Sequence, residues 1–128
     1  LYNWSSQPWK TQYWVREVMN RMFKNNIDGL CGNDDCGQMS AWYIFSSLGF
    51  YPFNAGSAEY VIGTPLFQKA VLHMPNGKEL VINAPRKSDK AIYVKSVKLK
   101  GKKITDWKLT HQQLMEGGTL DFTMSAKK

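Results

Sequence analysis

Apolar side chains recur every three or four positions in the first part of the chain, which is the spacing of one face of an α-helix. The members of this apolar stripe are Trp14, Val15, Val18, Met19 and Met22. The charged side chains of the opposite face are Lys10, Glu17, Arg21 and Lys24. Pro8 suits a first helical turn because its missing N–H would have no partner there, and Asn25 and Asn26 are typical of a helix end. The pattern predicts a helix over residues 8–25.

A second segment, residues 38–48, is apolar on nearly every face. The polar residues that interrupt it are small or neutral: Gln38, Ser40, Ser46 and Ser47. We predict a helix that ends at Gly49, because glycine readily takes the left-handed conformation that closes a helix. A helix without a polar face belongs in a protein interior, and 128 residues are few to cover it. We therefore expect a partner surface that this chain does not itself provide.

The second half of the chain has the shorter repeat of β-strands. Residues 70–74 and 80–84 flank the sequence Pro-Asn-Gly-Lys, which predicts a hairpin. Residues 91–99 alternate between apolar and lysine positions, with an irregularity near Ser96 that indicates a β-bulge. Residues 110–113 match a helix-capping box, and residues 119–124 alternate again. We predict a small antiparallel sheet that forms one layer of a sandwich.

Charge is distributed unevenly along the chain, whose formal net charge is +7. Up to Phe67 there are 4 basic and 5 acidic residues, whereas the remainder has 13 basic and 5 acidic residues. The lysines of the second half alternate along strands and lack the interleaved aromatic rings of a single-strand binder, so we expect no nucleic-acid partner. No apolar run approaches the roughly 18 residues of a membrane span. The chain begins at Leu1 without a leader, and we expect a mature or excised segment.

The strongest candidate for a catalytic or metal-binding segment lies between the two predicted helices. Residues 29–37 contain three glycines and two adjacent carboxylates, Asp34 and Asp35, just before a helix N-terminus. The helix dipole favours ionised carboxylates there, so this loop is suited to a general base or to ligands for a hard cation. The alternative is structural: Asn33 or Asp35 simply caps the second helix while the glycines serve the turn.

The remaining reactive side chains give weaker signals. Cys31 and Cys36 are five positions apart, which is not the spacing of a redox or zinc motif, and we expect free, partly buried thiols. A disulfide across so tight a loop is possible but geometrically demanding. His73 and His111 have no evident partner in the sequence, so we expect structural roles for both.

Two blocks of sequence resemble a known family. Residues 32–52 read Gly-Asn-Asp-Asp-Cys-Gly-Gln-Met-Ser-Ala-Trp-Tyr-Ile-Phe-Ser-Ser-Leu-Gly-Phe-Tyr-Pro, and residues 59–67 read Glu-Tyr-Val-Ile-Gly-Thr-Pro-Leu-Phe. Both blocks are similar to the C-terminal signature of glycoside hydrolase family 92, whose members are exo-acting, calcium-dependent α-mannosidases. Residues 1–4 and 7–12 resemble the stretch just upstream in that family, so the resemblance covers essentially the whole chain.

The resemblance implies an α+β chain. Residues 1–54 would be late helices of an (α/α)6-barrel catalytic domain, and residues 55–128 an antiparallel β-rich C-terminal region. It also implies inverting hydrolysis of terminal α-mannosidic bonds, with α-1,2 linkages expected. Inversion needs one carboxylic acid for the leaving oxygen and one carboxylate, roughly 6.5–9.5 Å away, that activates water. The family's general base falls on Asp35, and Asn33 occupies a position where some members carry a second acid that helps hold the water. We expect the leaving-group acid outside this chain.

The resemblance further implies a calcium cofactor, for which it assigns no ligand in this segment. The implied partners are mannose-containing glycans and the remainder of a longer polypeptide. A periplasmic or extracellular location is expected, because family enzymes are typically exported. The isolated segment is expected to be inactive. Two alternatives stay open: a carbohydrate-binding module formed by residues 68–128, and a catalytically inactive relative that serves assembly.

Overall fold

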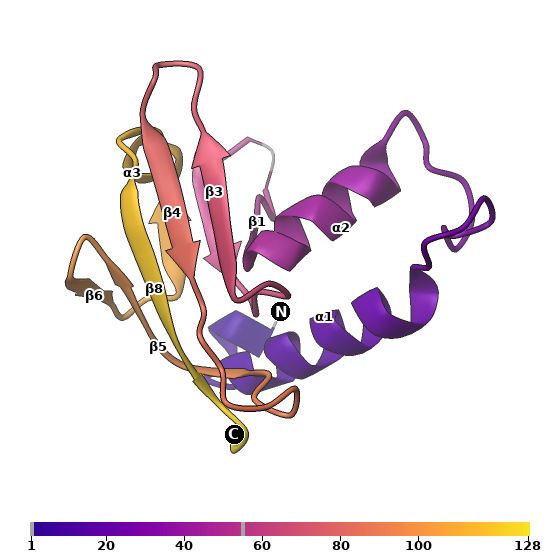
Figure 1. Ribbon diagram of the computed structural model, residues 1–128, viewed down its shortest axis with the longest axis horizontal. Coiled ribbons are helices and arrows are strands. Elements are labelled where there is room, and N and C mark those ends of the chain that lie inside the picture. Colours follow the sequence, from indigo (N-terminus) through magenta and orange to yellow (C-terminus); the bar gives the residue numbers. More distant parts are fainter. Residues whose placement is uncertain (1, 55) are drawn as a thin grey trace.

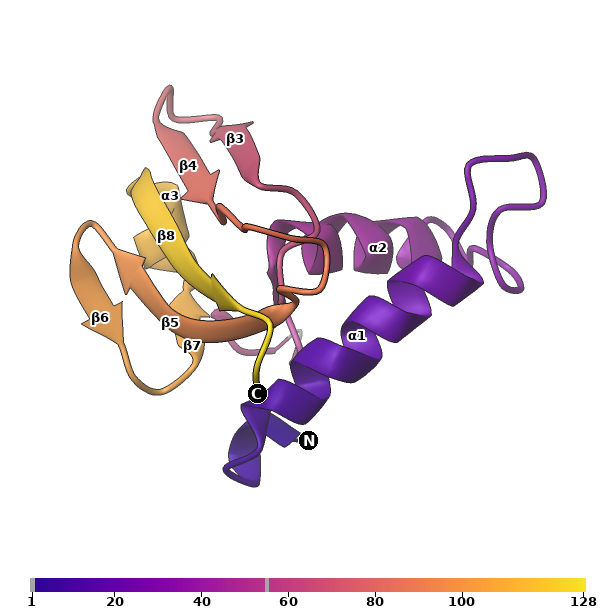
Figure 2. The same cartoon turned by 60° about the horizontal axis from the view of Figure 1, so that its bottom comes forward.

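The computed structural model describes residues 2–54 and 56–128. The two long helices lie at one end of the molecule and the strands, with a short third helix, at the other (Figures 1 and 2), which confirms the predicted α+β class. The helices of the first half are η1 (Tyr2–Trp4), α1 (Pro8–Met22) and α2 (Gln38–Leu48). Within the described part of the chain, no helix has the length and apolar character that a membrane crossing requires.

Helix α1 begins at Pro8 as predicted but ends at Met22, three residues before the predicted end. Phe23 is already extended, with φ −123° and ψ 134°. The next N–H, that of Lys24, donates to the Gly29 carbonyl at 2.8 Å instead of continuing the helical bonds. Helix α2 has the predicted bounds and closes on Gly49 at φ 97°, so its left-handed C-terminal cap is confirmed.

The strands form two sheets. The three-stranded sheet has the order β1 (Phe50–Tyr51), β2 (Glu59–Ile62), β7 (Lys108–Thr110). The five-stranded sheet has the order β3 (Lys69–His73), β4 (Glu79–Asn83), β8 (Gly118–Ser125), β5 (Tyr93–Leu99), β6 (Lys102–Ile104). A short helix, α3 (His111–Met115), links β7 to β8. Buried residues of both sheets belong to one hydrophobic cluster, as in a sandwich.

The prediction of a purely antiparallel sheet is wrong at one pairing. The hairpin β3–β4, the bulge between Val94 and Ser96, and the capping box at Thr110 are all confirmed. However, β8 runs parallel to β4, with Ile82 opposite Leu120. Parallel neighbours need a long crossover, and here the chain forms β5, β6, β7 and α3 before it returns beside β4. The alternation of apolar and polar residues cannot show strand direction, because a strand has the same alternation in a parallel and in an antiparallel pair.

Polar side chains attach α1 to the strands. Gln12 is buried, and its Oε1 accepts a hydrogen bond of 2.9 Å from the Val94 N–H, at the bulge of β5. Arg16 is also buried and donates to the Pro65 carbonyl and to Thr64 Oγ1. Burial, with repulsion from Arg86, lowers the pKa of Arg16 to about 10. Polar as well as apolar side chains of α1 therefore connect it to the rest of the fold.

Much of that apolar stripe stays open to solvent. Trp14 is 53% exposed and Met22 is 49% exposed, whereas Met19 is buried. On α2, Ile44 is 58% exposed. Both helices therefore have uncovered apolar surface, which the sequence predicted for α2.

Gly49 should resist substitution for two separate reasons. Its φ of 97° is left-handed, and a Cβ there would lie 2.9 Å from Pro65 Cδ and 3.1 Å from Phe122 Cζ. Gly77 is the matched control, because its φ is 77° but a Cβ there would have no neighbouring atom within 4 Å. We expect Gly77→Ala to cost about 1–2 kcal/mol of unfolding free energy for backbone strain. Gly49→Ala should cost roughly 1–3 kcal/mol more for overpacking. Urea unfolding of both variants measures the difference, and equal losses would contradict the packing argument.

Candidate active site

The loop between α1 and α2, residues 23–37, carries the acidic pair that the sequence singled out (Figure 2). Asp34 is half-buried and Asp35 is exposed. Asp35, Cys36 and Gly37 are consecutively left-handed, with φ of 43°, 62° and 94°. Non-glycine residues take this conformation only at a cost in free energy, and such positions concentrate at functional sites. The turn places Asp35 in solvent directly before the N-terminus of α2.

Asp34, and neither of the residues proposed from the sequence, caps helix α2. Its Oδ1 accepts from the Ser40 N–H at 2.8 Å, and its Oδ2 accepts from the Ser40 hydroxyl at 2.8 Å. Its backbone carbonyl accepts from the N–H groups of Gly37 and Gln38. The alternative that Asn33 or Asp35 caps the helix is therefore wrong.

The two adjacent carboxylates have different chemistry. The Ser40 N–H and then the Ser40 hydroxyl hold the pKa of the Asp34 carboxyl below its usual value. Both oxygens of Asp34 are thus occupied as acceptors. Within the described residues the Asp35 carboxylate forms no hydrogen bond or ion pair with another side chain or with the backbone. Asp35 is the carboxylate of the pair that remains free to accept a proton from water.

Asn33 lies two residues before Asp35 and is exposed. The two residues lie in the same loop, and no hydrogen bond joins their side chains in the described part of the chain. The role of Asn33 in positioning water stays a prediction, as does the role of Asp35 as general base.

Each of the four glutamate carboxylates contacts the nitrogen of a basic side chain. The pairs are Glu17 with Arg21, Glu59 with Lys108, Glu79 with His73, and Glu116 with Lys100. Each of these carboxylates lies 2.9–3.1 Å from the nitrogen of a basic side chain, so none of them is an unengaged carboxyl group. None of these glutamates is therefore suited to be the second carboxyl group of an inverting pair.

Over residues 2–54 and 56–128, no group of three or more His, Cys, Asp or Glu side chains is arranged to hold a metal ion. The side chains in these ranges therefore supply no ready-made cluster of carboxylate ligands for calcium.

Cys31 and Cys36 are free, as predicted, but both are exposed, so the expectation of partly buried thiols is wrong. The histidines also have partners that their sequence context did not reveal. His73 Nδ1 lies 2.9 Å from Glu79 Oε1, and His111 Nδ1 lies 3.0 Å from the Tyr60 hydroxyl.

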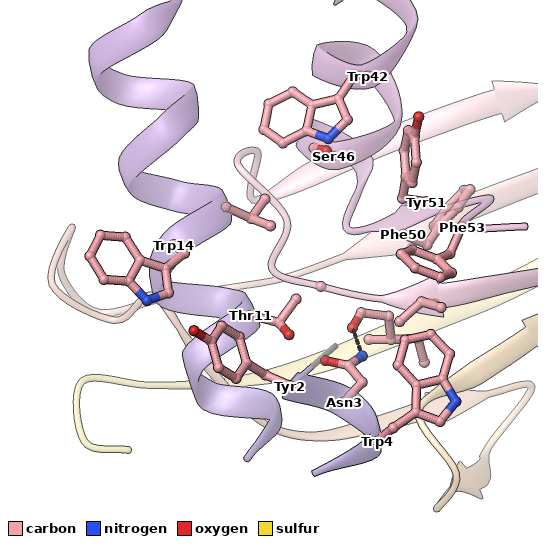
Figure 3. A pocket seen from close by; sticks show the side chains of 14 residues that line it. Tyr2, Asn3, Trp4, Thr11, Trp14, Trp42, Ser46, Phe50, Tyr51 and Phe53 are labelled. Carbon is pink, nitrogen blue, oxygen red and sulfur yellow. Dashed lines mark hydrogen bonds between the residues drawn. The ribbon is translucent and has the colours of Figure 1, made fainter. Parts of the chain in front are cut away.

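An aromatic hollow of about 440 Å³ lies between η1, α1, α2 and strands β1 and β2 (Figure 3). Trp14 and Trp42 reach it from the two helices, and Trp4 and Phe53 line its other side with their rings 5.1 Å apart. Asn3 donates from Nδ2 to the Ile62 carbonyl at its base, at 2.8 Å. The sequence did not show that these aromatic side chains, which all come from the first half of the chain, meet at one site.

A smaller hollow of about 380 Å³ opens between the loop and α2. Lys24, Leu30, Ser40 and Tyr43 are among the residues that line it. Ser40, which binds Asp34, is the lining residue that connects this hollow with the acidic loop, and neither Asp34 nor Asp35 is among its lining residues.

Comparison with known proteins agrees with these features. The family model described as the glycosyl hydrolase family 92 catalytic domain matches residues 1–126. The chain belongs to this family.

Solved structures of the family share the fold. A family GH92 alpha-mannosidase of Bacteroides thetaiotaomicron, solved with mannoimidazole, is 44% identical, with a TM-score of 0.93 over 98% of this chain. A family GH92 inverting mannosidase of the same bacterium is also 44% identical, with a TM-score of 0.84 over 93% of this chain. This chain covers 17% of the first of these proteins and 16% of the second.

A curated relative from Arthroderma benhamiae, described as an uncharacterized secreted glycosidase, is 27% identical over the whole of this chain. The chain spans 17% of that relative as well.

Proposed function

We propose that this chain is one segment of a longer, inverting α-mannosidase and that it supplies the general base, Asp35. The family match over residues 1–126 carries the proposal. The 44% identity to a family GH92 alpha-mannosidase supports the substrate class, and the 44% identity to a family GH92 inverting mannosidase supports the stereochemistry. We propose terminal α-1,2-mannosidic bonds of mannose-containing glycans as the substrate, with an exo mode of action.

The geometry of the acidic loop supports the role of Asp35. A general base for inversion must be ionised, open to water and free of competing donors. Asp35 is exposed, while the donors at the start of α2 are bound by Asp34. In the proposed step, the Asp35 carboxylate takes a proton from water as that water attacks the anomeric carbon. A carboxylic acid outside the described residues protonates the leaving oxygen.

Exposed apolar side chains on the helical side of the chain support the larger assembly. Trp4, Trp14, Ile44 and Phe53 are each more than half exposed. The first two and Phe53 line one hollow, and an exposed apolar patch of this kind is typical of an interface. We propose that it packs against further helices of an (α/α)6 barrel, which the rest of the longer polypeptide provides. The segment by itself should not hydrolyse mannosides.

Calcium and location belong to the same proposal. We propose that the whole enzyme binds calcium through oxygen ligands, most of which the rest of the longer polypeptide would provide, since the described residues show no cluster of three acidic or other ligating side chains. A periplasmic or extracellular location is supported by the relative described as a secreted glycosidase.

The C-terminal strands offer little support for the alternative of a carbohydrate-binding module. Of the aromatic residues after Phe67, Phe122 is buried in the core, and Tyr93 and Trp107 are half-buried. A sheet face that binds sugars needs open aromatic rings. We therefore favour packing as the role of this region.

The anomer of the first product tests the proposed reaction. The whole enzyme is mixed with a terminal α-1,2-linked mannobiose, and the released mannose is followed by proton NMR before it mutarotates. We expect β-mannose first, because a single displacement inverts the anomeric centre. Release of α-mannose first, or no release of mannose, would contradict the proposal.

A further inference from the structure

Asp34 takes up every backbone donor at the start of helix α2. Its carbonyl accepts from Gly37, Gln38 and Met39 at 3.0, 2.7 and 3.4 Å, and its carboxylate accepts from the Ser40 N–H at 2.8 Å. The N-cap residue itself, Gly37, has no side chain to offer. One residue outside the helix thus satisfies the donors that a helix N-terminus normally leaves open.

Asp35 is the nearest carboxylate that could compete for those donors. A carboxylate next to a helix N-terminus is drawn to its N–H groups and to the positive end of the helix dipole. If Asp35 bound there, its oxygens would be occupied and its basicity would fall, because hydrogen bonds to the charged form lower a carboxyl pKa. The left-handed turn at Asp35 and Cys36, with φ of 43° and 62°, instead leaves Asp35 exposed.

We infer that Asp34 and Ser40 are positioning residues for Asp35: by occupying the α2 N-terminus, they keep the Asp35 carboxylate free to take a proton from water. The second contact between them, from the Ser40 hydroxyl to Asp34 Oδ2 at 2.8 Å, holds the Asp34 carboxylate in this place. The lowered pKa of Asp34 agrees with a carboxylate kept ionised as an acceptor. This inference rests on the proposed function, and it adds that two adjacent acids of one loop have separate tasks.

The experiment uses the whole enzyme with the variants Ser40→Ala, Ser40→Thr and Asp34→Asn, at a temperature where each is folded by circular dichroism. We expect Ser40→Ala and Asp34→Asn to lower kcat by about tenfold to a hundredfold, as for a misplaced catalytic group. KM should stay within about threefold, because substrate binding does not use these residues. Ser40→Thr keeps the hydroxyl and should restore most of kcat.

Ser47→Ala is the matched control. Ser47 lies on the same helix, and its hydroxyl donates to the Ile44 carbonyl at 2.7 Å, far along α2 from the acidic pair. It should leave kcat unchanged. Wild-type kcat in Ser40→Ala and in Asp34→Asn, while Asp35→Asn is inactive, would overturn this inference and leave the proposed function standing. Activity of Asp35→Asn within tenfold of wild type would overturn both.

Discussion

Replacing Asp35 by Asn in the whole enzyme should lower kcat by about 10²–10⁴-fold, which is the usual contribution of a positioned general base. Asparagine has nearly the same size, but its amide cannot accept a proton from water at neutral pH. Because Asp35 is exposed and forms no internal contact in the described residues, the substitution should leave the fold intact. The measurement is kcat on a terminal α-1,2-mannoside, with thermal unfolding to check that the variant is folded.

Asp89→Asn provides the matched control for charge. Asp89 is exposed in the loop between β4 and β5, and its substitution removes the same charge from the strand end of the molecule. We expect it to retain wild-type kcat. If the Asp35→Asn enzyme had activity within tenfold of wild type, Asp35 would not be the general base. The proposed mechanism would then need another carboxylate.

Leu120→Ala should cause a large loss of stability, about 2–5 kcal/mol of unfolding free energy. Leu120 is fully buried in β8, the central strand of the five-stranded sheet. Its neighbours across the sheet are Ile82 on β4 and Leu99 on β5, and both are buried. Truncating the side chain at this position leaves a cavity that two hydrogen-bonded strands cannot collapse to fill. Urea unfolding followed by far-ultraviolet circular dichroism measures the loss.

Thr123→Ala tests whether the strand or the buried side chain is responsible. Thr123 lies on the same strand, but its side chain is exposed. A surface substitution of this kind usually changes stability by less than about 0.5 kcal/mol. If Thr123→Ala and Leu120→Ala were equally destabilising, the effect would come from the strand backbone, and the core would not depend on Leu120.

At the acidic loop, the sequence predicted the location of the candidate site but not the task of each carboxylate. The glycines and the two adjacent carboxylates marked residues 29–37 without any coordinates. The structural alternative placed the helix cap at Asn33 or Asp35, which is wrong, because a cap is defined by hydrogen-bond geometry that the sequence does not show. The structure gives that task to Asp34, through Ser40, and leaves Asp35 free.

The elements that could be predicted from the amino-acid sequence are those set by neighbouring residues. Helix α2, its cap at Gly49, the β3–β4 hairpin and the bulge in β5 all follow from contacts within a few positions of the chain. The short strands β1, β2, β6 and β7 were not predicted, because two to four residues carry too little periodicity.

Contacts between distant segments became visible only in the folded chain. The fold makes β8 a parallel neighbour of β4, attaches α1 through the polar Gln12 and Arg16, and leaves the apolar Trp14 open. Apolar periodicity shows that a helix has an apolar face, but it does not show which surface will cover that face. That depends on which distant segments compete for the same core.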